Sequence, residues 1–87
     1  MPTAGAVAAL AATCHRVAGT LPMEAVALAK ERTGEALAAL TAAGTSGHPR
    51  FLAAREELTA LCDDLDLVLS DLTTAAEQVR IFREQLG

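Results

Sequence analysis

An unbroken heptad pattern between residues 49 and 86 constrains this chain more than any other feature of its sequence. Apolar residues recur there every seven positions: Phe51, Leu58, Leu65, Leu72, Val79 and Leu86. A second set follows three positions later: Ala54, Leu61, Val68, Ala75 and Phe82. Repeats of this kind over five heptads are typical of a helix that packs along a seam against another helix. We therefore predict one long helix over about residues 49–86, roughly 55 Å in length.

Two breaks divide the residues that precede this helix. One is the run Gly19-Thr20-Leu21-Pro22, and the other lies at residues 44–49. Glycine suits the end of a helix and proline suits the first helical turn. We therefore predict two further helices, over about residues 3–18 and 21–43. The predicted apolar stripe of the first comprises Val7, Leu10, Ala11, Cys14 and Val17, and that of the second comprises Val26, Ala29, Thr33, Ala36, Leu37, Leu40 and Ala43. Thr20 is expected to cap the second helix, and His48 or Ser46 to cap the third. The chain is predicted to be a single all-α domain spanning residues 1–87.

Two arrangements of the three helices are compatible with this pattern. In a compact three-helix bundle, the first two helices turn back on each other at Gly19. In an antiparallel hairpin, they form one kinked arm against the long helix. The second helix alone is about 33 Å long, so a bundle leaves roughly 20 Å of the apolar seam uncovered. The first two helices together run about 60 Å and cover the seam. We favour the hairpin.

A bare two-helix hairpin buries little apolar surface, and further apolar residues lie outside the main seam. Leu67 and Ile81 fall on the side of the long helix opposite its seam. The pattern therefore predicts a second packed face, most simply a homodimer that forms a four-helix bundle, or a heterodimer with a related helical chain. The predicted inner seam comprises Leu58, Leu61, Leu65, Val68, Leu72 and Val79, with Phe82 near its end. Leu67 and Ile81 are the predicted outer contacts.

Charge narrows the classes of partner. The net charge is −4, and six carboxylates with no basic residue lie between Glu56 and Asp71. Nucleic acids and acidic membrane surfaces both attract the opposite sign, so neither is an expected partner. A solvated helix face is the simpler reading of this acidic run. The other reading is docking of a basic protein on Asp63, Asp64 and Asp66.

Few residues have the spacing that catalysis or metal binding requires. Cys14 and His15 are adjacent, so on a helix they point about 100° apart and do not form a nucleophile–base pair. Cys14, His15, Cys62 and His48 lack a second ligand at helical spacing, and no C-x-x-C occurs. The cysteines are expected to be reduced packing residues in a cytoplasmic protein, with export without a signal peptide as the alternative. No cofactor, metal or small-molecule ligand is expected.

The central glycine-containing loop Gly44-Thr45-Ser46-Gly47, flanked by two long helical arms, resembles the small helical-hairpin (WxG-type) proteins of type VII secretion. The loop has no Trp for that family's W-x-G turn, and Leu86 follows Phe82 where the family carries Y-x-x-x-D/E. The resemblance implies a four-helix-bundle dimer and an association with secreted proteins or toxins. The Ala/Leu/Arg-rich third helix also resembles small helical proteins of high-GC bacteria.

These observations lead to three hypotheses about function. The first is a non-enzymatic protein–protein interaction module that packs through helical-hairpin or coiled-coil contacts. The second, of the same class, is a partner or chaperone of a toxin or secreted protein that docks on the acidic face. The third is a thiol or redox enzyme that uses Cys14 or Cys62. We expect the chain not to be an enzyme.

Overall fold

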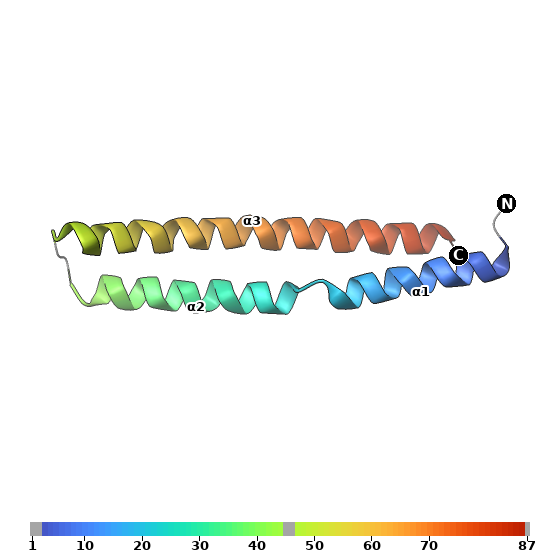
Figure 1. The fold of residues 1–87 in the computed structure, drawn as a ribbon, viewed down its shortest axis with the longest axis horizontal. Coiled ribbons are helices and arrows are strands. Elements are labelled where there is room, and N and C mark those ends of the chain that lie inside the picture. The colour runs from blue at the N-terminus through green and yellow to red at the C-terminus, as the bar shows by residue number, and fades with distance from the viewer. Residues whose placement is uncertain (1–2, 45–46, 87) are drawn as a thin grey trace. The chain divides into compact units, whose positions relative to one another are not determined.

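The computed structural model describes residues 3–44 and 47–86 and contains three helices. They are α1 (Ala4–Thr20), α2 (Met23–Ala42) and α3 (Pro49–Leu86), as Figure 1 shows. No strand occurs within the described ranges. The all-α prediction is therefore confirmed, and every helix boundary lies within two residues of the predicted one.

The break between α1 and α2 lies two residues later than predicted. Only Leu21 and Pro22 separate the two helices, and Leu21 is extended, with φ −66° and ψ 125°. A proline disfavours helical geometry in the residue before it, which explains why the helix stops here. Thr20 does not cap α2. It lies in the last turn of α1, where its hydroxyl donates to the carbonyl oxygen of Val17 at 3.0 Å.

The N-terminus of α3 has the cap that was predicted on His48. The backbone N–H of Arg50 donates to Nδ1 of His48 at 3.1 Å, and the N–H of Phe51 donates to the His48 carbonyl oxygen at 3.0 Å. Pro49 occupies the first helical position, where its missing N–H costs no hydrogen bond. Ser46, the alternative cap, lies outside the described residues.

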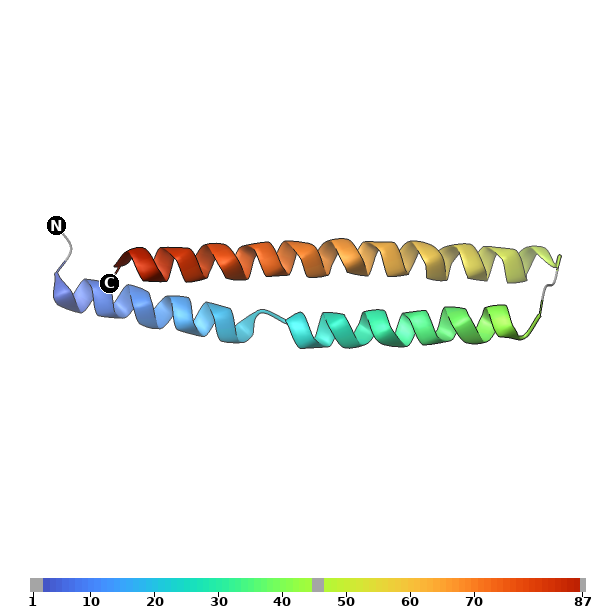
Figure 2. The same ribbon diagram turned by 180° about the vertical axis from the view of Figure 1, so that it is seen from behind.

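The helices form two compact units, and each is a pair of helical segments. One unit contains α1 and the part of α3 from Asp71 onward; the other contains α2 and the part of α3 up to Ser70. In each unit the two segments lie side by side and antiparallel, as both views show (Figures 1 and 2). Because α1 groups with the end of α3 and not with α2, the fold is the predicted helical hairpin and not a compact three-helix bundle.

Candidate interaction surface

One row of α3 side chains is half-buried from end to end. This row, the seam column, comprises Phe51, Leu58, Leu65, Leu72, Val79 and Leu86. These are the residues that recur every seven positions in the predicted seam. The residues four positions after them are also half-buried over the middle of the helix. We call these the inner column: Cys62, Leu69 and Ala76.

The row three positions after the seam column lies outside the contact within each unit. This outer column comprises Ala54, Leu61, Val68, Ala75 and Phe82, and all five residues are exposed. Leu61, Val68 and Phe82 keep 44%, 44% and 45% of their surface accessible. The placement of Leu61, Val68 and Phe82 in the inner seam is therefore corrected: in the single chain they flank it.

Helix geometry explains why the apolar heptad pattern did not decide which flank of the seam column is covered. Each residue advances about 100° around the axis, so the residue four positions after a seam residue lies about 40° to one side of it. The residue three positions after lies about 60° to the other side. A single neighbouring helix covers the seam column and one of these flanks. In this protein both flanks are apolar, and the covered one is the inner column.

The first helix repeats the same division. Val7 and Ala11 of α1 are half-buried, and Cys14 is the one buried residue among those described, at 7% exposure. Leu10 and Val17, each three positions after a seam residue, are exposed. The apolar stripe predicted for this helix therefore splits into a covered side and an open side.

On α2 the exposed flank is made of alanine. The half-buried residues are spaced alternately by three and four: Met23, Val26, Lys30, Thr33, Leu37 and Leu40, with Gly34 beside Thr33. Among these, Val26, Thr33 and Leu40 are the seam residues of α2. The alanines three positions after them, Ala29, Ala36 and Ala43, are exposed. The predicted α2 stripe included these alanines and omitted Lys30, so it is corrected by one column.

The open flanks of paired helices lie on the same side. In an antiparallel pair, the second helix runs in the opposite direction, and its seam also points in the opposite direction. Together these two changes leave matching flanks of the two helices on the same side of the pair. Equal angular offsets from the seam therefore point to one broad face of the pair. In the unit that contains α2, this face carries Leu61 and Val68 beside Ala29 and Ala36. In the unit that contains α1, it carries Leu10 and Val17 beside Phe82.

An ion pair joins the two helices of the α2 unit. The Lys30 ammonium of α2 contacts a carboxylate oxygen of Asp66 on α3, and both side chains are partly exposed. The hydrogen bond from Lys30 to Asp66, followed by the charge attraction between them, raises the pKa of Lys30 above its ordinary value of 10.5. Asp66 therefore serves the hairpin itself. Of the three predicted docking carboxylates, Asp63 and Asp64 stay exposed without an ion pair to another described residue.

The two predicted outer contacts behave differently. Leu67 is the most exposed of the large apolar residues, at 65%, whereas Ile81 is half-buried. Each lies two positions after a seam residue, about 200° around the helix, so both lie on the back of α3. They do not belong to the broad face that carries the outer column.

A second charge cluster lies near the end of α3. The Arg80 guanidinium forms ion pairs with Glu77 and Glu84, one turn to either side. The hydrogen bond from Arg80 lowers the pKa of Glu77, and the carboxylates raise that of Arg80. Pairs at this spacing stabilise a helix locally and do not connect it to another element.

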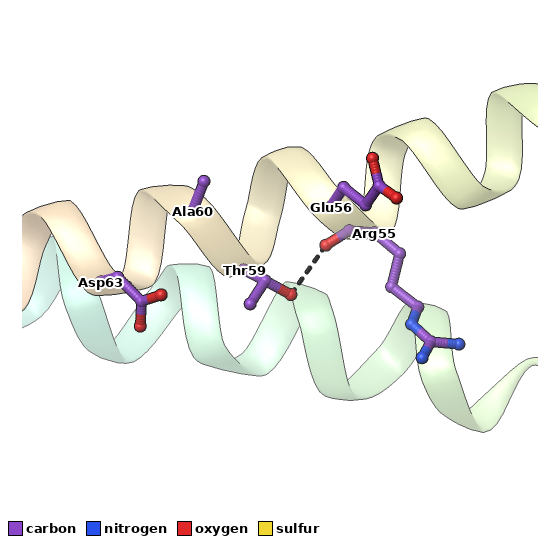
Figure 3. Close-up of a pocket in the computed structure, with 5 residues that line it drawn as sticks. All are labelled: Arg55, Glu56, Thr59, Ala60 and Asp63. Carbon is purple, nitrogen blue, oxygen red and sulfur yellow. Dashed lines mark hydrogen bonds between the residues drawn. The ribbon is translucent and has the colours of Figure 1, made fainter.

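A shallow depression on α3 shows what the surface offers to a small molecule. It is lined by Arg55, Glu56, Thr59, Ala60 and Asp63, all from two successive turns of one helix (Figure 3). The Thr59 hydroxyl donates to the carbonyl oxygen of Arg55 at 2.8 Å, so it is engaged within its own helix. The depression is open to solvent and offers no enclosed, mostly apolar cavity of the kind that binds small ligands.

The structure places the two cysteines in different units. Cys14 belongs to the α1 unit and Cys62 to the α2 unit, and both are free thiols. Within the described ranges, no group of three or more His, Cys, Asp or Glu residues is placed to hold a metal ion.

Comparison of this chain with known proteins identifies no relative. Protein-family models, curated protein sequences and solved structures were all searched, and none matches the chain. Among the described residues, no helix combines the length and the apolar character that crossing a membrane requires.

Proposed function

We propose that this chain is a non-enzymatic interaction module that packs its open apolar face on a second helical hairpin. The simplest partner is a second copy, which makes a homodimeric four-helix bundle. The observation that carries this proposal is the position of the outer column. Leu61, Val68, Ala75 and Phe82 recur every seven residues along α3, as in a packed seam, yet α1 and α2 leave them exposed.

Surface area supports the same proposal. A compact protein of 9.0 kDa exposes about 4,900 Å², whereas this chain exposes 6338 Å². The excess is roughly 1,400 Å², and a standard interface covers about 800 Å² on each partner. One further hairpin on the open face would therefore cover somewhat more than half of this excess.

Solution mass tests the proposal directly. Light scattering on a size-exclusion column is expected to give twice 9.0 kDa for the wild-type chain. Val68→Asp is expected to shift the mass toward the monomer, because it places a charge in the proposed interface. Leu67→Asp is the matched control, since Leu67 is the neighbouring residue and points away from that face. A wild-type monomer with a cooperative thermal melt would contradict the proposal.

A second candidate function is docking of a basic partner, such as a toxin or a secreted protein, on the acidic side of α3. Asp63 and Asp64 are exposed, and both Asp63 and Glu56 line the shallow depression on α3. A basic helical protein that co-purifies with the chain and is released by salt supports this function. Asp63→Asn should then weaken co-purification and leave the solution mass of the free chain unchanged.

A thiol or redox function rests on Cys14 or Cys62, and the structure favours packing for both. Cys14 is buried on the covered side of α1, and Cys62 belongs to the inner column of α3. Two free thiols in separate units fit a reducing compartment, so we place the chain in the cytoplasm.

A further inference from the structure

The Lys30–Asp66 ion pair shows which residues of α2 and α3 lie at the same level. This register supports a more specific inference. In antiparallel helices, two residues forward along α2 correspond to two residues back along α3. Arg32 therefore lies at the level of Asp64. By the same rule Ala36 lies level with Ala60, next to Leu61, and Ala29 lies level with Leu67, next to Val68.

The two sides of the open face in this unit differ in side-chain size, so two copies can pack large residues over small ones. Its α3 side carries the large residues Leu61 and Val68, and its α2 side carries Ala29 and Ala36 at nearly the same levels. Small residues allow a facing helix to approach closely. Leu61 of one copy therefore fits over Ala36 of another copy, and Val68 fits over Ala29.

Charges border this face on both helices. Arg32 directly precedes the seam residue Thr33, and Asp64 directly precedes the seam residue Leu65. Their angular offsets are equal, so both side chains lie at the edge of the open face. Glu57 occupies the same position one heptad earlier on α3, so two carboxylates, Glu57 and Asp64, lie on this edge of the unit, and Arg50 occupies the position at the start of the helix. The Arg32 guanidinium pairs with Glu35 of its own helix, at 3.2 Å, and both side chains are exposed.

Two symmetric ways of joining the faces differ in their electrostatics. A twofold axis parallel to the helices places α2 of one copy on α3 of the other, keeps every level matched and brings Arg32 next to Asp64 of the second copy. A twofold axis across the helices places α3 on α3 and brings the Glu57 and Asp64 carboxylates of the two copies to the same edge, where they repel each other. The first arrangement combines opposite charges with large-over-small packing.

We propose that the second copy binds with its α3 on α2 of the first, held in register by Leu61 over Ala36 and by an Arg32–Asp64 pair between copies. This inference rests on the proposed homodimer and specifies its interface. To form this pair, the Arg32 guanidinium turns from Glu35 of its own helix toward the edge of the open face.

Cysteine cross-linking tests the arrangement. In a chain that carries Cys14→Ala and Cys62→Ala, Ala36→Cys and Leu61→Cys are introduced separately, and the two proteins are mixed and oxidised. The mixture is expected to form a covalent dimer on a denaturing gel, and neither protein alone is expected to do so. Efficient cross-linking of the Leu61→Cys protein with itself would overturn the proposal, since it reports α3 on α3. A dimer by light scattering that forms no mixed cross-link would overturn it as well.

Charge reversal gives an independent readout. Arg32→Asp is expected to raise the dimer dissociation constant by about 3- to 10-fold, and Arg32→Asp with Asp64→Arg to restore it within about 2-fold. An unchanged dissociation constant in the single variant would contradict the Arg32–Asp64 pair. A monomeric wild-type chain, in contrast, would remove the homodimer itself, so light scattering separates failure of the interface geometry from failure of the proposed function.

Discussion

Lys30 of α2 forms an ion pair with Asp66 of α3, and it is the one ion pair among the described residues that connects two different helices. Lys30 occupies a half-buried position in the same column as Met23 and Leu37. Its aliphatic stem can therefore lie along the apolar seam while its ammonium reaches the carboxylate at the edge. The contact sets the register of the hairpin in this unit.

The first prediction concerns the pH dependence of this contact. Asp66 raises the pKa of Lys30 in the folded state above 10.5, so its contribution to stability is fully present below that pH. The contribution is lost as pH rises through the raised folded-state value. The melting temperature of the wild type should therefore fall toward that of Lys30→Met as the pH rises above 10.5 and through the raised folded-state pKa.

The same experiment has an internal control. Asp66→Asn removes the carboxylate that raises the pKa of Lys30, so this variant should show little difference from Lys30→Met across the pH range. If the difference in melting temperature between the wild type and Lys30→Met stays the same at every pH, the ion pair contributes nothing to stability.

The sequence predicted α3 well because its apolar spacing persists through five heptads, and helix periodicity is the strongest local pattern. It did not predict which flank of the seam column is covered. Leu61 and Val68 are at least as apolar as Cys62 and Leu69, so hydrophobicity alone favours neither side. The choice depends on which helix face α1 and α2 present, and that is a tertiary property.

The ion pair between Lys30 and Asp66 was not predicted, for a related reason. A lysine interrupts an apolar stripe when residues are classed only as apolar or polar, so the α2 seam was shifted by one column. Asp66 stands in a run of carboxylates in which Asp63 and Asp64 look equivalent to it. Only the register of α2 against α3 distinguishes the carboxylate that has a partner from those that do not.

The second prediction uses two glycines that should respond to alanine in opposite directions. Gly44 follows α2 with φ +112°, a backbone conformation that side chains with a Cβ disfavour. Gly44→Ala should therefore destabilise the protein by about 1 kcal/mol. Gly34 lies inside α2, and a Cβ there meets no atom within 4 Å, so Gly34→Ala should stabilise by about 0.5–1 kcal/mol. Urea unfolding at fixed protein concentration measures both changes.

The third prediction concerns the seam column. Leu65 is half-buried between α2 and α3, and Leu65→Asp places an unpaired charge against the α2 helix. The free energy of unfolding should fall by about 2 kcal/mol or more. Leu67→Asp, which makes the same chemical change at a 65% exposed position, should change it by less than about 0.5 kcal/mol. Equal circular dichroism melts for the two variants would remove Leu65 from the seam.

The fourth prediction concerns the thiols. Cys14 is 7% exposed whereas Cys62 is half-buried at the edge of its unit, so a thiol reagent should modify Cys62 first in the native protein. Modification of Cys14 requires the α1 unit to open, and its rate should rise with urea until both cysteines react equally in the unfolded chain. The single-cysteine variants Cys14→Ala and Cys62→Ala assign the two rates. Rapid modification of Cys14 in the native state would instead show an accessible, activated thiol, and would favour the thiol-enzyme hypothesis over packing.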